Sequence, residues 1–403
     1  MQRKPIPRPY YLEKLQALRE KPIIKVIMGA RRSGKSTLMT LHQEALHGDG
    51  VDDAHIIAFN LDDEANAHLR DHEALHQAVL DRMSDNGTYY LFLDEIQLCP
   101  QFEKAVTSLF LRPNIDIVVT GSNAFMLSGE LATLLAGRYV AIEVMPLSFK
   151  EFRNAVAPEN NSRETDFNRY LQYGTFPALL DYLTVPHLMV DYYEMLFNSI
   201  VVKDIATRHQ IRDIRSLTQV IRTLVSSIGS PVSARNMANT LKSAGQPTSV
   251  PTISQYLSAL QEVYFFYPVP RFDLNGRAIL RAQEKYYLAD PGFRQHLSTS
   301  ASPDIGHLIE NVVYLELRRR YPHVYIGKAA DKEIDFVVRK GERLAYFQVA
   351  LSILDEATRK RELAAFDSVK DNFPKTLLTL DTIGTNTSYN GIEHLNLLDW
   401  LLA

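Results

Sequence analysis

One eight-residue segment constrains the fold of this chain more than any other. Residues 29–36 read GARRSGKS and fit the pattern G-x-x-x-x-G-K-[ST], in which successive backbone N–H groups point at phosphate oxygens. The pattern binds phosphate where it joins a buried strand to the start of a helix. Here the apolar run IIKVIM at residues 23–28 precedes it, and the helical pattern LMTLHQEAL at residues 38–46 follows. The sequence therefore predicts a strand, a phosphate-binding loop (P-loop) and a helix rather than an unrelated glycine-rich turn.

The residues of this P-loop have separate predicted roles in binding ATP or ADP. The glycines Gly29 and Gly34 let the backbone bend around phosphate groups. Lys35 should neutralise charge on the β- and γ-phosphates, and the Ser36 hydroxyl should be a ligand of Mg²⁺. Arginine side chains in the loop either add phosphate contacts or stay solvated. The predicted nucleotide-binding residues are Gly29, Ala30, Arg31, Arg32, Ser33, Gly34, Lys35, Ser36 and Thr37.

Five short apolar runs in the first third of the chain alternate with amphipathic segments. Such runs are typical of strands buried on both faces. Their alternation with helical patterns favours a parallel sheet covered by helices on each side. The sequence therefore predicts an α/β fold with at least five such strands, at residues 23–28, 55–60, 89–95, 116–123 and 139–144.

Polar side chains follow two of these runs. Asp94 and Glu95 come after the apolar run YYLFL, and we predict that Asp94 holds Mg²⁺ while Glu95 orients the attacking water. The alternative is an acidic pair that faces solvent. VVTGSN ends another strand, where Ser122 or Asn123 could contact the γ-phosphate. We prefer Asn123, although a simple turn residue is the alternative.

Arg138 stands directly before the fifth predicted strand. A guanidinium there could stabilise transition-state charge in a neighbouring subunit's site, because its own site already contains Lys35. The alternative is a surface arginine. The first interpretation predicts a homo-oligomer, with a ring as one possibility.

The remaining chain divides into three predicted regions after a nucleotide-binding domain at residues 1–148. Residues 149–210 have a helical pattern and are predicted to form a lid or bridge. Residues 211–292 show helix, turn, helix and then two strands joined at Asn275-Gly276, which is the order of a winged helix. Residues 293–403 alternate strands and helices and form a second α/β domain.

The winged-helix region has features that suit DNA. Residues 206–290 contain ten Lys and Arg against five Asp and Glu, while the whole chain has a net charge of −3. One helix pattern separates an apolar side from a polar side that could enter a groove. A lid or a protein-binding module is the alternative. The polar side consists of Thr252, Ser254, Gln255 and Ser258, and the apolar side of Ile253, Tyr256, Leu257 and Leu260.

The last region has part of the layout of a metal-dependent nuclease core. Glu310 lies on its first helix and Asp335 on a predicted strand. The next strand carries Gln348 and Ala350, where a second carboxylate and a lysine would be needed. Without that acid and that base, metal binding and water activation should both be poor. We therefore predict a scaffold without nuclease activity.

Composition adds limits on the class of protein. Hydrophobic residues make up 46% and charged residues 23%, the balance of a globular protein. The N-terminal segment lacks the apolar core of a secretion signal, and no apolar run is long enough to span a membrane. The single Cys99 cannot form an internal disulfide and is expected to be a packing residue. These features predict a cytoplasmic protein.

The order of these motifs resembles a family of prokaryotic AAA+ ATP-binding proteins. The resemblance is carried by GARRSGKST, YYLFLDEIQ, VVTGSN, LLAGRYVAIEVMPLSFKEF and YGTFPALL, and it spans nearly the whole chain. KEIDFVVRKGERLAYFQVAL is similar to that family's C-terminal domain of unknown function, which itself resembles the restriction-endonuclease-like fold. The resemblance implies ATP in the P-loop, Mg²⁺ near Asp94, water near Glu95, and hydrolysis between ring subunits with Arg138 at the interface.

These observations lead to one preferred function and two alternatives. The preferred function is an ATP-driven homo-oligomeric motor or switch that acts on DNA. The first alternative is a nucleotide-dependent signalling or defence switch that acts on a protein partner. The weaker alternative is an ATP-regulated nuclease.

Overall fold

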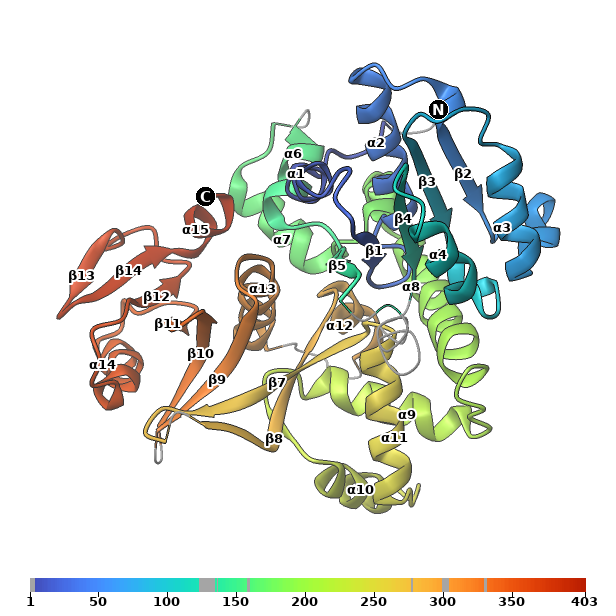
Figure 1. The fold of residues 1–403 in the computed structure, drawn as a ribbon. Helices are drawn as coiled ribbons and strands as arrows, with labels where there is room; N and C mark the ends of the chain where they lie inside the picture. Colours follow the sequence, from blue (N-terminus) through green and yellow to red (C-terminus); the bar gives the residue numbers. More distant parts are fainter. Residues whose placement is uncertain are drawn as a thin grey trace. The chain divides into compact units, whose positions relative to one another are not determined.

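The computed structural model describes residues 4–122, 135, 137–157, 160–276, 278–298, 304–329 and 332–403. These residues divide into two compact units, which Figure 1 draws as ribbons. The N-terminal unit comprises Met1–Pro146 together with the short segments Phe176–Ala178 and Glu262–Tyr264. The C-terminal unit comprises Leu147–Thr175, Leu179–Gln261 and Phe265–Ala403.

A five-stranded parallel sheet forms the centre of the N-terminal unit. Its strand order is β2-β3-β4-β1-β5. Every residue of β1 and β3 is buried, as expected for strands covered on both faces. The five predicted strands and their parallel arrangement are therefore confirmed. The strands are β1 (Ile24–Met28), β2 (Ile56–Asn60), β3 (Tyr89–Asp94), β4 (Ile115–Gly121) and β5 (Tyr139–Glu143).

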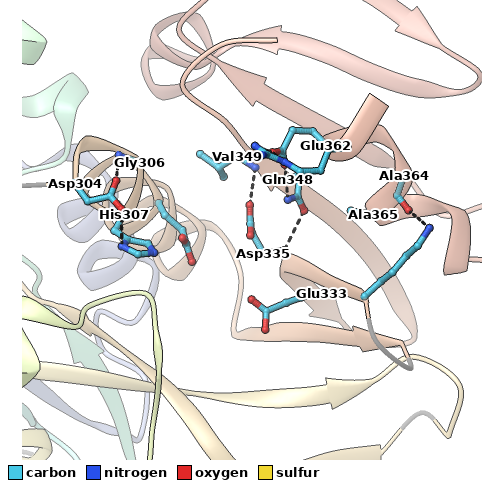
Figure 2. A pocket seen from close by; sticks show the side chains of 13 residues that line it. Asp304, Gly306, His307, Glu333, Asp335, Gln348, Val349, Glu362, Ala364 and Ala365 are labelled. Atoms are coloured by element: carbon cyan, nitrogen blue, oxygen red, sulfur yellow. Dashed lines mark hydrogen bonds and ion pairs between the residues drawn. The ribbon is translucent and has the colours of Figure 1, made fainter. Parts of the chain in front are cut away.

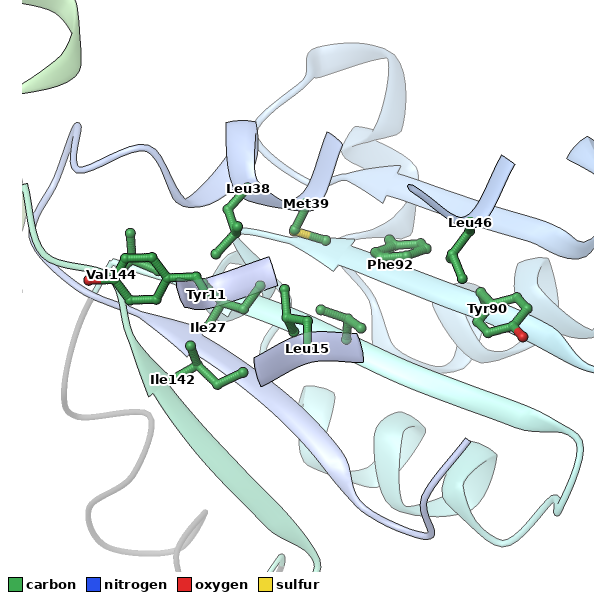
Figure 3. Packing of buried hydrophobic residues seen from close by; sticks show 11 residues of the cluster. Tyr11, Leu15, Ile27, Leu38, Met39, Leu46, Tyr90, Phe92, Ile142 and Val144 are labelled. Carbon is green, nitrogen blue, oxygen red and sulfur yellow. The ribbon is translucent and has the colours of Figure 1, made fainter. Parts of the chain in front are cut away.

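Helices cover both faces of this sheet. On one face, α1 (Pro9–Ala17) and α2 (Lys35–Gly48) pack against the strands. Figure 3 shows this core, in which Tyr11 and Leu15 of α1 and Leu38 of α2 belong to one buried cluster with side chains of β1, β3 and β5. On the other side of the sheet lie α3 (His72–Asp81) and α4 (Phe102–Phe110) (Figure 1). Short 3₁₀ turns at Asp53–His55, Glu64–Leu69 and Ile96–Leu98 complete the unit.

The C-terminal unit contains most of the helices. Three of them fall in the region that the sequence predicts to be helical, and the last of these continues into a π-helical segment, Ser199–Ala206. Among the described residues, no helix is both long and apolar enough to cross a membrane. The α-helices are α6 (Phe149–Val156), α7 (Arg163–Tyr173), α8 (Leu188–Asn198), α9 (Ile214–Ser226), α10 (Ala234–Ser243), α11 (Val250–Glu262), α12 (Gly292–Leu297), α13 (Ile305–Arg320), α14 (Glu356–Ala364) and α15 (Leu397–Leu402), with 3₁₀ turns at Pro177–Tyr182 and Ala365–Ser368.

A nine-stranded mixed sheet runs through the C-terminal unit in the order β13-β14-β12-β11-β10-β9-β7-β8-β6. Strands β7 and β8 form the predicted antiparallel hairpin, and β6 pairs with the far side of β8. Strand β7 also pairs in parallel with β9, so two regions separated in the sequence share one sheet and each covers an edge of the other. The strands are β6 (Pro231–Val232), β7 (Phe266–Asp273), β8 (Ala278–Leu288), β9 (His323–Ala329), β10 (Lys332–Lys340), β11 (Arg343–Val349), β12 (Lys375–Thr379), β13 (Thr387–Tyr389) and β14 (Ile392–Asn396).

Candidate functional site

Two glycines shape the loop between β1 and α2. Gly29 has φ +143°, and a Cβ atom there would lie 2.1 Å from the carbonyl oxygen of Val144. Gly34 has φ +98° and directly precedes α2. Because L side chains rarely adopt such backbone angles, glycine is required at both positions. The loop can therefore follow its path only with the two glycines of the motif.

The polar groups of this loop fit an anionic ligand. The residue before α2 is Gly34, which has no side chain to cap the N–H groups of the first turn. The Lys35 ammonium group donates to the carbonyl oxygens of Gly29 and Ala30, at 3.1 Å each. The buried Ser33 hydroxyl has no hydrogen-bond partner among the described residues. A glycine-rich loop that leads into a helix start beside a lysine is the arrangement that binds phosphate in other proteins.

The outer residues of the loop differ in exposure. Ser36 and Thr37 are exposed at the start of α2, and Arg31 is half-buried. Arg32 is exposed and has φ +68°, which places its backbone in the left-handed region. The predicted contacts of these side chains with a nucleotide and Mg²⁺ remain predictions.

The two predicted acidic residues lie at the end of β3, where a threonine binds the carboxylate of Asp94 and the backbone of Glu95. The Thr120 hydroxyl on β4 donates a hydrogen bond to Asp94 Oδ1 and accepts one from the Glu95 N–H group at 3.0 Å. Glu95 has φ +51° and accepts a hydrogen bond at Oε2 from the Gln97 amide. The sequence did not point to Thr120, because its partners lie 26 and 25 residues away on another strand.

The sheet register brings the P-loop and these carboxylates to one edge. Met28 of β1 pairs with Gly121 of β4, while Leu93 of β3 pairs with Val119. All three strands are parallel, so their carboxyl ends meet at the same level of the sheet. The P-loop, which follows β1, and Asp94, which ends β3, therefore face the same side.

The other two predicted site residues lie differently. Ser122 is buried directly after β4, whereas Asn123 lies outside the described residues. Arg138 is exposed and immediately precedes β5, whose Tyr139 pairs with Ile24 at the start of β1. The P-loop begins after Met28, the other end of β1. Four residue steps, or about 13 Å along the strands, therefore separate the Arg138 end of β5 from the P-loop end. Arg138 thus lies at the opposite edge of the sheet from the site of its own chain.

Comparisons with known proteins agree with this geometry. Residues 21–153 match the family model described as an AAA domain. The chain is 37% identical over 400 residues to an uncharacterized protein of Haemophilus influenzae, and the match covers 98% of each chain.

This chain is a P-loop AAA-type ATPase of that protein's family.

Further comparisons cover the rest of the AAA-type ATPase. Residues 164–304 and 305–395 match two domains of unknown function, DUF8612 and DUF4143. An uncharacterized protein of Methanocaldococcus jannaschii is 29% identical over 364 residues, covering 86% of this chain and 79% of that protein. The fold is similar to that of a Walker-type ATPase of Pyrococcus abyssi, with a TM-score of 0.52 and 14% identity over 72% of this chain and 95% of that one.

The C-terminal unit of the ATPase contains a polar cavity of about 570 Å³ at the predicted nuclease-like position (Figure 2). Glu310 of α13 and Asp335 of β10 both line it, as the sequence predicts, and Gln348 of β11 lies beside them. Two further acids that sequence reasoning missed also line the cavity, namely Glu333 of β10 and Glu362 of α14. Figure 2 labels Glu333, Asp335, Gln348 and Glu362 from β10, β11 and α14, and Glu310 comes from α13.

A lysine from outside the predicted domain reaches this acidic cluster. The Lys285 ammonium group of β8 lies 3.1 Å from Glu310 Oε1 and 2.7 Å from Glu333 Oε1. Burial alone would lower the pKa of Lys285, but the carboxylates of Glu310 and Glu333 outweigh it and raise that pKa. Lys285 is therefore a protonated counter-ion rather than a base.

Asp335 is also satisfied by the protein itself. Its Oδ2 accepts a hydrogen bond from the Val349 N–H group at 2.8 Å, and its own N–H group donates to Gln348 Oε1 at 3.2 Å. Burial raises the pKa of Asp335 well above its usual range, and the nearby Glu310 carboxylate adds to this effect. Across the described ranges, no group of three or more His, Cys, Asp or Glu side chains is arranged to hold a metal ion.

Helix α11 divides its surface as the sequence predicts. Its apolar residues Ile253, Tyr256, Leu257 and Leu260 are buried. On the opposite side, Ser254, Gln255 and Ser258 are exposed and Thr252 is half-buried. Helices α9, α10 and α11 with strands β6, β7 and β8 follow the element order that suggests a winged helix.

Proposed function

We propose that this ATPase binds and hydrolyses ATP with Mg²⁺ at the shared edge of β1, β3 and β4. The observation that carries the proposal is the single edge of the sheet at which the glycine-shaped P-loop and the Thr120-bound Asp94 carboxylate meet. Lys35 and the loop N–H groups would hold the phosphates, and Ser36 and Asp94 would hold Mg²⁺, which stabilises negative charge during phosphoryl transfer. Glu95 would accept a proton from the attacking water.

Nucleotide binding and phosphate release test this proposal together. Wild-type protein should bind ATP and ADP in calorimetric titrations and should release phosphate. Lys35→Ala should lose both properties, because the cation for the β- and γ-phosphates is gone. Lys21→Ala, at an exposed position beyond the end of α1, serves as a matched control that should leave both properties intact. Equal ATP affinity for wild type and Lys35→Ala would rule out this site.

We propose further that the protein is a homo-oligomer in which Arg138 completes the site of a neighbouring copy. This proposal is supported by the exposed position of Arg138 at the sheet edge opposite its own P-loop. A cation there can reach developing phosphate charge only on another copy. A ring is one arrangement that would allow this contact.

Mixing two inactive variants tests this contact. Arg138→Ala and Glu95→Gln should each hydrolyse ATP poorly when alone. When mixed, intact Glu95 of one copy can meet intact Arg138 of another, so activity should partly return. Light scattering with a non-hydrolysable ATP analogue should show the oligomer. Mixtures that remain as inactive as their components would exclude a role for Arg138 between copies.

We propose that the preferred target of this ATPase is DNA. Among the basic residues of segment 206–290, Arg271 and Lys285 are buried in ion pairs and cannot contact DNA. Among those whose side chains the structure describes, the exposed ones are Arg208, Arg212, Arg215, Arg222, Arg235 and Lys242. The exposed polar side of α11 lies in the same segment, so positive charge and a polar helix face are both available for a groove.

A salt series tests the DNA proposal. Binding of duplex or branched DNA should weaken steeply as salt rises. Arg235→Ala combined with Lys242→Ala should weaken binding further and reduce the salt dependence by about two phosphate contacts. DNA should also stimulate the ATPase rate. No DNA retention at low salt would eliminate this part of the proposal.

A protein partner is the second candidate, because one apolar patch favours it. Leu351, Leu354 and Ile383 are 50%, 65% and 73% exposed. They lie on two loops that are joined by hydrogen bonds, including one from the Leu380 N–H group to the Leu351 carbonyl at 3.1 Å. Exposed apolar groups of this kind commonly mark protein contacts. An ATPase rate that does not respond to DNA at any salt concentration would favour this signalling or defence role.

The nuclease alternative receives less support from the cavity. Lys285 already neutralises Glu310 and Glu333, which a metal ion would otherwise need as ligands. Plasmid DNA incubated with Mg²⁺ or Mn²⁺ should therefore remain uncut by wild type. Cleavage that disappears in Asp335→Ala would establish the nuclease.

A further inference from the structure

The N-terminal arm contributes an arginine to the P-loop that the sequence motifs do not include. Arg8 directly precedes α1 and is only 3% exposed. Its Nη1 donates to the carbonyl oxygen of Ser33 at 3.2 Å, and its Nη2 donates to that of Met145 at 2.7 Å. The guanidinium group therefore links the end of the P-loop to the segment that follows β5.

Two further contacts hold this arginine in place. Its guanidinium carbon lies 4.7 Å from the centre of the Tyr11 ring, within the range of a cation–π interaction. The Tyr11 hydroxyl accepts a hydrogen bond from the Met145 N–H group at 3.2 Å. Both backbone groups of Met145 are thus bound, one by Tyr11 of α1 and one by Arg8 directly before α1, so the arm has one defined position against the site.

The bond to Ser33 affects the backbone group that faces the ligand. In a trans peptide unit the C=O and N–H groups point in opposite directions. Arg8 holds the carbonyl oxygen of the unit that joins Ser33 to Gly34, so the Gly34 N–H group must point away from Arg8. Gly34 ends the P-loop and precedes α2, where N–H groups bind phosphate oxygens.

The space around Gly34 supports the same conclusion. A Cβ atom at Gly34 would lie 3.8 Å from Arg8 Nη1 and 3.6 Å from Cγ of Pro177, a residue of the N-terminal unit. The peptide is therefore packed on one side by Arg8 and Pro177. Gly34 has φ +98°, an unusual backbone conformation that the contacts with Arg8 and Pro177 help to maintain.

We propose that Arg8 is a positioning residue of the nucleotide site, which orients the Ser33–Gly34 peptide so that the Gly34 N–H group can donate to a nucleotide phosphate. The inference rests on the proposed ATP binding. It assigns to the N-terminal arm a role in phosphate affinity that is separate from its packing against the sheet.

Binding of ATP and of pyrophosphate by full-length variants tests this role. Arg8→Met should weaken the affinity for both ligands about tenfold, because a misoriented peptide loses a hydrogen bond to a charged group. Arg8→Lys can still reach one carbonyl oxygen and should lie between Arg8→Met and wild type. Pyrophosphate has no base or ribose, so a loss shared by both ligands places the defect at the phosphates.

Arg19→Met is the matched control. Arg19 lies just beyond the other end of α1, contacts the Tyr90 ring and pairs with Asp49. This variant should lower the midpoint of thermal unfolding without changing ATP affinity. The proposal is overturned if Arg8→Met binds ATP as tightly as wild type, even when its unfolding midpoint falls. If Arg8→Met does not fold, Arg8→Lys decides, and wild-type affinity in that variant overturns the proposal. If wild type binds no more ATP than Lys35→Ala, the proposed function itself fails.

Discussion

Each unit contains a buried lysine in a region where the sequence predicts a site, but one lysine donates to carbonyl oxygens and the other pairs with carboxylates. Lys35 of the AAA domain donates to the carbonyl oxygens of Gly29 and Ala30. Lys285 of the C-terminal cavity lies against the carboxylates of Glu310 and Glu333. Both lysines are buried, so burial is not what separates the two sites.

The difference shows how similar residues can form a ligand site or a closed structural cluster. The carbonyl oxygens of Gly29 and Ala30 are neutral, so exchanging these two hydrogen bonds for phosphate oxygens leaves no charge behind at either carbonyl. Lys285 cannot leave its partners at similar cost, because two carboxylates would lose their counter-ion. The first arrangement suits nucleotide binding, while the second resists both metal ions and substrates.

The largest expected effect concerns the AAA domain and tests whether its site is catalytic. Glu95→Gln should lower kcat for ATP hydrolysis by about 10²–10⁴-fold, because the water loses its general base. ATP affinity should remain close to that of wild type, since Lys35 and the P-loop are intact. Phosphate release and calorimetric titration measure the two quantities. A kcat within threefold of wild type would remove Glu95 from the mechanism.

The second effect tests whether Lys285 is a structural counter-ion. Lys285→Met should lower the free energy of unfolding of the protein by about 3–5 kcal/mol, because Glu310 keeps a buried, unpaired charge. Denaturant unfolding in the absence of nucleotide measures this value. The double variant Lys285→Met/Glu310→Gln should regain part of the loss. A double variant as unstable as the single one would contradict the ion-pair explanation.

The third effect concerns the Thr120 hydroxyl, which binds the Asp94 carboxylate and the Glu95 backbone. Thr120→Val keeps the side-chain shape but removes the hydrogen bonds to Asp94 and from the Glu95 N–H group. We expect kcat to fall about tenfold, since each bond contributes about 1 kcal/mol. Thr120→Ser retains the hydroxyl and should restore most of the rate. A serine variant as slow as the valine variant would show that the methyl group, not the hydroxyl, matters.

The smallest expected effect is a change of protein stability with pH that comes from Asp335 in the C-terminal cavity. Because the pKa of Asp335 is raised in the folded protein, folding is favoured by its protonated form, and this contribution decreases as pH rises above the unfolded value of about 4. Asp335→Asn removes the titration. The free energy of unfolding of the variant, relative to wild type, should therefore rise between pH 5 and pH 8. A constant difference over that range would argue against a raised pKa.

Much of the N-terminal unit could be predicted because its signals are local. The P-loop pattern occupies eight consecutive residues, and the apolar runs that became β1 to β5 are visible within single windows of sequence. Parallel order then follows from the alternation of strands with helices. Asp94 and Glu95 could be selected because they directly follow one of these runs. Their placement beside the P-loop needed only the rule that carboxyl ends of parallel strands meet at one edge.

The tertiary structure decided which side chains meet across long separations. Thr120 reaches Asp94 across 26 residues, and Arg8 reaches Met145 across 137. Lys285 was counted from sequence as part of a basic DNA-binding surface, but the pairing of β7 with β9 joins its hairpin to the C-terminal sheet, where it meets Glu310 and Glu333. The local sequence around each of these residues does not predict which residue it contacts. A hydrophobic period shows which face of a strand is buried, whereas strand order and register decide what lies opposite that face.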